Sequence, residues 1–320
     1  MARPGCAWAA TTWATGVCGS DIHVYHGKHP FTPFPVVQGH EYSGTVVKTG
    51  SAVTKVTPGI LATARPQLVC GKCGPCQRGQ YNVCTNLRVQ GFQAPGAAAD
   101  YFVVPKDRVI TIPANMTADQ AALVEPAAVG AHSTKRVGDL VGKNVVVSGA
   151  GTIGNLVAQF AVIRGAKSVL ITDYSAFRLQ KALDCRIPFA ANLKEEKFTD
   201  AVARAFGEEG FQVGFEAVGV QGALDALVNN VEKGGAIGII GVYEEQPRIN
   251  MGFVCEHELT VSGSMMYRQE DYEETVQFIA EGKVQTTPLI TGHFPFEQYL
   301  EAYQYIDREG ERTLKTMIDL

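Results

Sequence analysis

The chain has 320 residues, of which 46% are hydrophobic and 19% charged, and a formal net charge of −4. This length is sufficient for a large buried core and suggests two domains. The mild negative charge and the absence of a long basic run argue against a nucleic-acid partner, and no apolar stretch approaches the ~18 residues of a membrane span. The first residues lack the apolar segment of a secretory signal peptide, so a cytoplasmic protein is expected, in which disulfides are rare.

Three short segments contain residues of the types that bind metal ions. Segment 15–23 contains Cys18, segment 35–44 contains His40 and Glu41, and segment 122–130 contains Glu125. A thiolate, an imidazole and a carboxylate make a zinc ligand set that can keep a fourth position open. Each residue alone also fits a structural role. Their joint occurrence in a chain that also contains a four-cysteine segment and a dinucleotide-binding pattern, both described below, favours a catalytic zinc site.

The stretches 34–55 and 99–112 are rich in valine and glycine and are punctuated by proline, which is typical of a compact β unit. Between them lie four cysteines, Cys70, Cys73, Cys76 and Cys84, with the spacing C-x2-C-x2-C-x7-C. This spacing lets a short lobe fold around one tetrahedral zinc ion, although an iron–sulfur cluster or a redox pair is an alternative. Four thiolates leave no open position on a zinc ion, so the lobe is predicted to be structural.

A dinucleotide-binding pattern follows. Segment 143–148 is a predicted strand, which leads into Gly149-x-Gly151-x-x-Gly154, a predicted helix over 155–165 and a second strand over 168–173. The glycines let a pyrophosphate approach the N-terminus of the helix. Asp173 would accept hydrogen bonds from the adenosine ribose and repel a 2′-phosphate, which favours NAD over NADP, although Arg178 lies close by in the sequence.

The alternation of strands and helices continues through 212–219, 222–231 and 234–241. It predicts an α/β fold in which a doubly wound parallel sheet spans about residues 130–263.

These motifs carry a family resemblance. Segments 16–23, 39–41, 124–126 and 149–154 and the four-cysteine lobe occur in the order found in the zinc-dependent medium-chain dehydrogenase/reductases, and resemble most the sorbitol (L-iditol), butanediol and threonine dehydrogenase branch. The resemblance implies a GroES-like catalytic domain (1–129), a Rossmann cofactor domain (130–263) and a C-terminal return to the catalytic domain (264–320). It also implies a homodimer or homotetramer.

Carried over by position, the resemblance implies a role for each candidate residue. Cys18 and His40 are expected to bind the catalytic zinc, with either Glu41 or Glu125 as the third ligand, while Ser20 and His23 match the proton-relay positions. The expected cofactor-binding residues are Gly149, Gly151, Thr152, Ile153, Gly154, Asp173 and Arg178, and the structural zinc ligands are Cys70, Cys73, Cys76 and Cys84. His26 and His29 match no family ligand position and are interpreted as loop histidines.

The implied function is the reversible, NAD-dependent oxidation of a secondary alcohol or polyol, with two zinc ions per chain. The alternatives are a threonine 3-dehydrogenase-like or sugar-phosphate alcohol dehydrogenase, a zinc-free quinone reductase, which would lack the cysteine lobe, and a nucleotide-binding relative that has lost catalysis. The presence of Cys18 and His40 argues against the last of these.

Two features depart from the family pattern. Only 17 residues precede Cys18, fewer than usual, and Ala7–Trp13 lacks a strand pattern. The expectation is that the chain is either truncated or has a misassigned start, and either would affect the integrity of the catalytic domain. Segment 262–268 falls where sorbitol dehydrogenases place an arginine and a tyrosine that face the polyol; here Tyr267 matches the tyrosine, but Met266 occupies the arginine position.

Overall fold

The structure is a computed structural model that describes residues 6–320, with side chains from residue 13 onward. These residues form two compact units. The first unit comprises residues 6–125, Arg268–Gly282 and Ile290–Leu320, and the second comprises Pro126–Tyr267 and Lys283–Leu289. The segment Lys283–Leu289 thus belongs to the second unit, although the sequence analysis assigned the whole of 264–320 to the catalytic domain.

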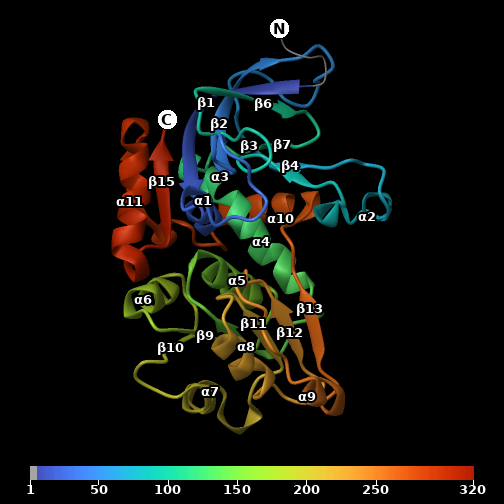
Figure 1. Cartoon of the computed structure of the whole chain (residues 1–320), viewed down its shortest axis with the longest axis vertical. Coiled ribbons are helices and arrows are strands. Elements are labelled where there is room, and N and C mark those ends of the chain that lie inside the picture. The colour runs from blue at the N-terminus through green and yellow to red at the C-terminus, as the bar shows by residue number, and fades with distance from the viewer. Residues whose placement is uncertain (1–5) are drawn as a thin grey trace. The chain divides into compact units, whose positions relative to one another are not determined.

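The first unit is built on a seven-stranded sheet with the order β14-β15-β1-β2-β3-β7, in which β6 also pairs with β1 (Figure 1). Its strands are β1 (Cys6–Val17), β2 (Glu41–Thr49), β3 (Leu61–Ala64), β6 (Tyr101–Pro105), β7 (Val109–Thr111), β14 (Ile290–Pro295) and β15 (Lys315–Asp319). A separate two-stranded sheet, β4 (Gln67–Leu68) with β5 (Arg88–Val89), flanks the cysteine lobe. The β-rich unit expected from the valine-rich stretches is therefore present.

The strand β1 corrects an expectation, because Ala7–Trp13 lacked a strand pattern in the sequence yet lies within a 12-residue strand. Its backbone pairs with β6, β2 and β15. The pairing with β2 shifts register at three places between Trp8 and Ala14. Such irregularities interrupt the regular backbone pairing of a strand, so the sequence need not show an unbroken two-residue periodicity.

Short helices connect and cover the strands of the first unit. They are α1 (Gly19–Tyr25), α2 (Gly74–Gln77), α3 (Ala118–Ala122), α10 (Gln269–Ala280) and α11 (Tyr299–Glu309), with 3-10 turns at η1 (Tyr81–Val83), η4 (Phe296–Gln298) and η5 (Gly310–Arg312). Helix α4 (Val124–Lys135) begins at the end of this unit and continues into the second.

The second unit is a six-stranded, all-parallel sheet with the order β10-β9-β8-β11-β12-β13. This is the strand order of a Rossmann fold. The strands are β8 (Asn144–Ser148), β9 (Ser168–Asp173), β10 (Phe189–Asn192), β11 (Val213–Glu216), β12 (Ala236–Ile239) and β13 (Thr260–Gly263). The helices are α5 (Thr152–Ile163), α6 (Ala176–Asp184), α7 (Phe198–Phe206), α8 (Gln221–Val228) and α9 (Met251–Glu256), with 3-10 turns at η2 (Gly207–Glu209) and η3 (Thr287–Leu289).

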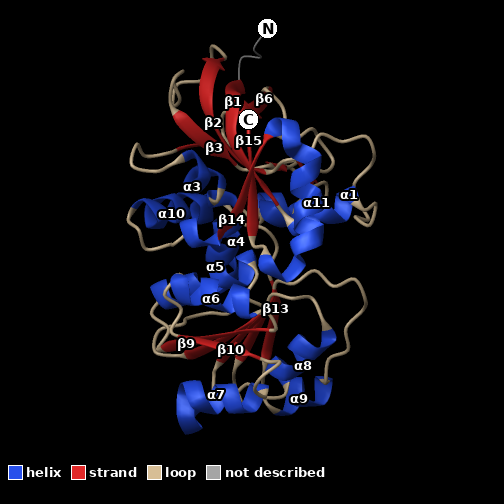
Figure 2. Ribbon diagram, turned by 90° about the vertical axis from the view of Figure 1, so that its left-hand side faces the viewer, coloured by secondary structure: helices blue, strands red, loops and turns tan. Residues whose placement is uncertain are grey.

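Helices cover both faces of this sheet, as Figure 2 shows for α5 and α6 on one side and α7, α8 and α9 on the other. One buried cluster joins Val145 and Val147 to Val157 of α5, and another joins Val146 to Leu224 and Leu227 of α8. Strand β8 is consequently buried along its whole length, which explains its unbroken valine run. Within residues 6–320, no helix combines the length and apolarity that a membrane span requires.

Candidate active site

Cys18, His40 and Glu41 come together in the first unit. Cys18 is the N-cap of α1, and His40 immediately precedes β2, in which Glu41 is the first residue. One ligand atom from each of the three lies within 4.8 Å of the others. His40 and Glu41 are buried and Cys18 is partly exposed. This is a thiol–imidazole–carboxylate set of the kind that binds catalytic zinc.

Asp21, which the sequence analysis did not single out, positions two of these residues. Its Oδ2 accepts a hydrogen bond from the backbone N–H of Cys18 at 2.9 Å, and its Oδ1 lies 3.5 Å from Nδ1 of His40. Oδ1 and Nδ1 are both buried, and neither has a hydrogen-bond partner among the described residues. Because Asp21 faces Nδ1, the other ring nitrogen, Nε2, is left to bind a metal, which is the usual arrangement of a ligand histidine.

The charge of Asp21 also acts on His40. Burial alone would lower the pKa of His40, but the neighbouring Asp21 carboxylate outweighs burial and holds the pKa well above 6.5. Without a metal, the buried imidazole is therefore stabilised in its protonated form. A zinc ion bound at Nε2 of His40 would replace the proton on that nitrogen.

Glu41 is paired with a buried lysine. Lys315, at the start of β15, donates from Nζ to both carboxylate oxygens of Glu41, at 2.7 Å for Oε1, and to the carbonyl oxygen of Val17 at 3.2 Å. Burial lowers the pKa of Lys315, but the charge of Glu41 more than compensates, so the pKa is raised. Only a glycine fits at position 16, since a Cβ there would lie 2.2 Å from Oε2 of Glu41.

Glu125, the other candidate third ligand, lies in the first turn of α4 and is 5% exposed. It does not belong to the group formed by Cys18, His40 and Glu41. Its charge nevertheless contributes to raising the pKa of both Lys315 and Tyr42, so it lies in the same buried polar region.

The two expected proton-relay residues, Ser20 and His23, lie three positions apart on α1 and are both partly exposed. Residues with this spacing share one face of a helix. His29, interpreted from sequence as a loop histidine, is indeed in a loop, where its Nδ1 lies 2.7 Å from Oγ1 of Thr32. Its pKa is lowered, first by burial and then by the proximity of His23. His26 pairs with Asp307 at 3.0 Å.

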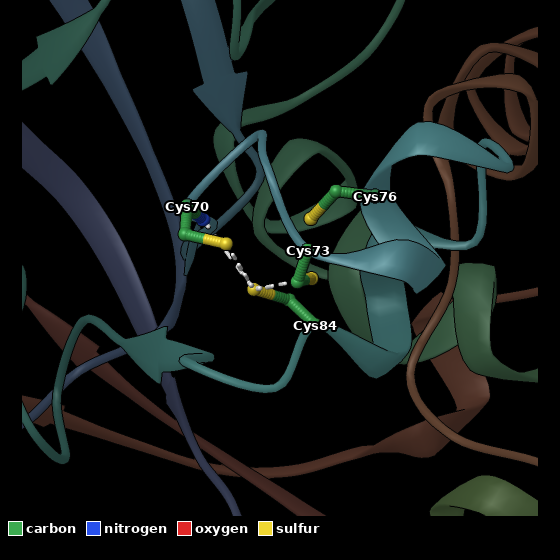
Figure 3. Close-up of side chains that lie close together, drawn as sticks. All are labelled: Cys70, Cys73, Cys76 and Cys84. Atoms are coloured by element: carbon green, nitrogen blue, oxygen red, sulfur yellow. Dashed lines mark hydrogen bonds between the residues drawn. The ribbon is translucent and has the colours of Figure 1, made fainter.

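The sulfur atoms of Cys70, Cys73, Cys76 and Cys84 gather in one place (Figure 3). Sγ of Cys84 lies 3.5 Å from Sγ of Cys70 and 3.8 Å from Sγ of Cys73. A zinc ion with four sulfurs at ~2.3 Å has sulfur–sulfur edges of about 3.8 Å. The lobe therefore has the dimensions of a four-thiolate zinc site.

The thiols of this lobe differ in acidity. Backbone N–H groups of Cys76 and Thr85 lower the pKa of Cys73 to about 5, whereas desolvation and the neighbouring Cys73 raise the pKa of Cys76 to about 12. Four crowded sulfurs cannot all ionise without a cation, so the arrangement suits a bound metal.

The cysteine lobe is anchored within the first unit. Tyr81 of η1 accepts a hydrogen bond from the backbone N–H of Gln269, and Arg65 lies over the Tyr81 ring at 5.1 Å. The Nε of Arg65 in turn donates to the Gln269 side chain. These contacts attach the lobe to α10, so its folding affects the C-terminal part of the unit.

The glycine loop of the second unit is shaped for a dinucleotide. Gly149 has φ +101°, and a Cβ at Gly154 would lie 1.8 Å from the carbonyl oxygen of Gly149. Gly151 is the N-cap of α5 and provides no side-chain cap, and a Cβ there would meet no other described atom within 4 Å. Thr152, Ile153 and Gly154 form the first turn, whose N–H groups can bind a phosphate.

Asp173 lies at the carboxyl end of β9, as expected. Its Oδ2 accepts from the N–H of Ala150 in the glycine loop at 2.7 Å, and its Oδ1 accepts from the N–H groups of Tyr174 and Ser175. The carboxylate is thereby fixed at the loop, with lone pairs left for a ribose hydroxyl. Arg178 is in the first turn of α6, where its N–H bonds to Oγ of Ser175.

The segment compared with the polyol-facing residues of sorbitol dehydrogenases lies at the end of the second unit. Tyr267 is fully buried, and Met266 has φ +50°, which is rare for a residue with a side chain. Tyr267 therefore has no exposed surface in this structure.

Of the residues that the sequence analysis missed, Asp21 had a local signal. It stands three residues after Cys18 and bonds back to the Cys18 N–H as in a capping box. Lys315 had none, because it is 274 positions from its partner Glu41.

Comparisons with known proteins identify the family. Residues 11–114 match the alcohol dehydrogenase GroES-like domain, and residues 152–281 match the zinc-binding dehydrogenase family. The L-threonine 3-dehydrogenase of Saccharopolyspora erythraea is 34% identical over 295 residues, covering 91% of this chain and 85% of that protein.

Sorbitol dehydrogenase 1 of Saccharomyces cerevisiae is 33% identical over 316 residues, which cover 95% of this chain and 88% of that protein. Among solved structures, a zinc-binding dehydrogenase from Sinorhizobium meliloti 1021 bound to NADP superposes with a TM-score of 0.93 at 27% identity, covering 100% of this chain and 93% of that one. With the metal-ligand cluster, the cysteine lobe and the Rossmann sheet described above, these matches show that the chain belongs to the zinc-dependent medium-chain alcohol dehydrogenase family.

Proposed function

We propose that this protein oxidises a secondary alcohol or polyol to the ketone, reversibly, with NAD as the hydride acceptor. The observation that supports this proposal is the gathering of Cys18, His40 and Glu41 beside Asp21. That ligand set is separate from the four-cysteine lobe and leaves a coordination position for a substrate.

In this proposal, Cys18, His40 and Glu41 hold the catalytic zinc. Glu41 is preferred over Glu125 because Glu41, and not Glu125, belongs to the group of possible metal ligands that Cys18 and His40 form among the described residues. Asp21 orients His40, and Lys315 fixes the carboxylate of Glu41. A zinc ion held there supplies Lewis acidity, which lowers the pKa of an alcohol towards neutrality.

Ser20 and His23 would carry away the proton of the substrate alcohol. A hydroxyl on one turn of α1 and an imidazole three residues later lie on one helix face, with the imidazole partly exposed to solvent. A histidine with access to water can pass a proton to solvent near neutral pH.

The glycine loop and the first turn of α5 would bind the pyrophosphate through Gly149, Gly151, Thr152, Ile153 and Gly154. Asp173, held at the loop by three backbone N–H groups, supports NAD as the cofactor, because its charge disfavours a 2′-phosphate. Arg178 would contribute a cation near the adenosine end.

The cysteine lobe would hold a second, structural zinc through Cys70, Cys73, Cys76 and Cys84. Its sulfur–sulfur distances and its attachment to α10 support a role in stability. We further expect a cytoplasmic homodimer or homotetramer, as the family resemblance implies.

The substrate class is tested by following NADH absorbance with metal-replete protein on sorbitol and other polyols, butanediol, L-threonine and sugar phosphates. L-threonine is the second candidate, because a threonine dehydrogenase is 34% identical to this chain. Faster turnover of polyols or diols than of L-threonine supports the proposal. Turnover of L-threonine alone would replace it with the second candidate, and NADH binding without turnover of any alcohol would contradict it.

A further inference from the structure

Glu216, the last residue of β11, is a buried acid that the catalytic proposal does not use. It is 0% exposed, at the carboxyl end of the strand beside β8. Its Oε2 atom is buried and has no hydrogen-bond partner in the described part of the chain. A carboxylate in such a place is costly unless its other contacts compensate for burial, so its presence needs an explanation.

Its other oxygen fixes the turn that follows β11. Oε1 accepts hydrogen bonds from the N–H of Val218 at 2.9 Å and of Gly219 at 2.8 Å. Gly219 has φ +84°, and a Cβ there would lie 2.4 Å from the carbonyl oxygen of Val242. The side chain of Glu216 therefore determines the path of residues 217–219.

This turn is in close contact with the glycine loop. A Cβ at Gly149 would lie 2.8 Å from Cγ2 of Val218 and 3.1 Å from the carbonyl oxygen of Ala217. A Cβ at Gly154 would lie 3.4 Å from Cβ of Ala217. Two of the three motif glycines thus pack on the turn that Glu216 holds.

The loop after β12 meets the same carboxylate from the other side. A Cβ at Gly241 would lie 2.5 Å from Oε2 of Glu216 and 2.3 Å from the N–H nitrogen of Gly219. Tyr243 also faces Glu216, since burial and then this carboxylate raise the pKa of Tyr243. Glu216 therefore lies where the loops that follow β8, β11 and β12 converge.

We propose that Glu216 is a positioning residue for the dinucleotide, which acts by holding the turn 217–219 against the glycine loop. In parallel α/β sheets, ligands bind at the carboxyl ends of the strands. The hydrogen bonds that Oε1 accepts from Val218 and Gly219 matter here, rather than the negative charge. This inference rests on the proposed binding of a nicotinamide cofactor by the second unit.

The test compares two conservative variants. Glu216→Gln keeps the length of the side chain and an oxygen that can accept from Val218 and Gly219, while Glu216→Asp keeps the charge but is one methylene too short to reach them. We expect Glu216→Gln to leave the Kd for NADH close to that of the wild type. Glu216→Asp should raise this Kd about tenfold, because two buried N–H groups lose their acceptor. The KM for the oxidised cofactor should rise with the Kd, while kcat at saturation stays unchanged.

Asn144→Ala is the matched control, because Asn144 is buried at the opposite, amino end of β8, where its Nδ2 donates to the carbonyl oxygen of Gly210 at 3.0 Å. It should lower the melting temperature without changing the Kd for NADH. The inference is overturned if Glu216→Asp loses only stability, as this control does, or if Glu216→Gln weakens NADH binding as much as Glu216→Asp does. Failure of the wild type itself to bind NADH would instead contradict the proposed function.

Discussion

Lys315 and Glu41 form a buried ion pair within the candidate metal centre, with Nζ of Lys315 2.7 Å from Oε1 of Glu41 and side chains that are 3% and 1% exposed. Nζ also bonds to the carbonyl oxygen of Val17, the residue before Cys18. The ammonium group therefore neutralises the carboxylate that, among the described residues, forms a possible metal-ligand group with Cys18 and His40.

Replacing Lys315 by methionine leaves Glu41 buried and uncompensated. The metal-free protein should lose about 3–5 kcal/mol of stability, the typical cost of breaking a buried pair. A zinc ion at Cys18 and His40 would compensate for Glu41, so the loss should be smaller in metal-replete protein. Thermal melts with and without zinc measure the difference, and Lys315→Met/Glu41→Gln should recover part of the stability. An equal loss in both metal states would show that Glu41 is not near the ion.

The choice of third ligand is tested by metal content. Glu41→Gln should reduce the zinc bound per folded chain from two to about one and abolish turnover, because the remaining two ligands hold the ion weakly. Glu125→Gln is the matched control and should retain both ions. Loss of one zinc in Glu125→Gln, with two retained in Glu41→Gln, would exchange their roles.

The metal-free protein should be less stable at higher pH. The pKa of His40 is raised above 6.5 in the folded chain, so its protonated form contributes stability that is complete below about pH 6.5 and is lost as pH rises through the raised value. Zinc competes with that proton, so zinc affinity should increase over the same range. Melting of chelator-treated protein at several pH values should show this decline, and Asp21→Asn, which removes the charge that raises the pKa, should flatten it. An identical decline in Asp21→Asn would assign the effect to other groups.

Cofactor preference should depend on Asp173. The wild type should bind NAD more tightly than NADP, and Asp173→Ser should reduce the preference by removing the charge. Asp173→Ser should also weaken NAD binding, because the hydrogen bond from the N–H of Ala150, in the glycine loop, to the Asp173 carboxylate is lost. Arg178→Met serves as the comparison and should weaken NADP more than NAD. Wild-type protein that binds NADP as well as NAD would show that a cation near the ribose dominates.

The sequence predicted those features that are local. The strand at β8, the glycine loop and Asp173 follow one another within 30 residues, so their spacing indicated the Rossmann unit, and the four cysteines lie within one short lobe. Strand β1 was missed because register shifts with β2 remove its periodicity. The pairing of Lys315 with Glu41 could not be predicted, since it depends on β15 lying next to β1 in the folded sheet. The same holds for the contact of the 217–219 turn with Gly149.

The central claim is that catalysis belongs to the Cys18 and His40 site and stability to the cysteine lobe. Single-turnover NADH formation, measured with thermal melting on the same preparations of Cys18→Ser and Cys76→Ser, tests it most directly. Cys18→Ser should fold and bind NADH but turn over orders of magnitude more slowly, since each ~1.4 kcal/mol of lost transition-state stabilisation is tenfold in rate. Folded Cys76→Ser should melt at a lower temperature and keep measurable hydride transfer. Near-normal turnover by Cys18→Ser, with none in well-folded Cys76→Ser, would contradict the account.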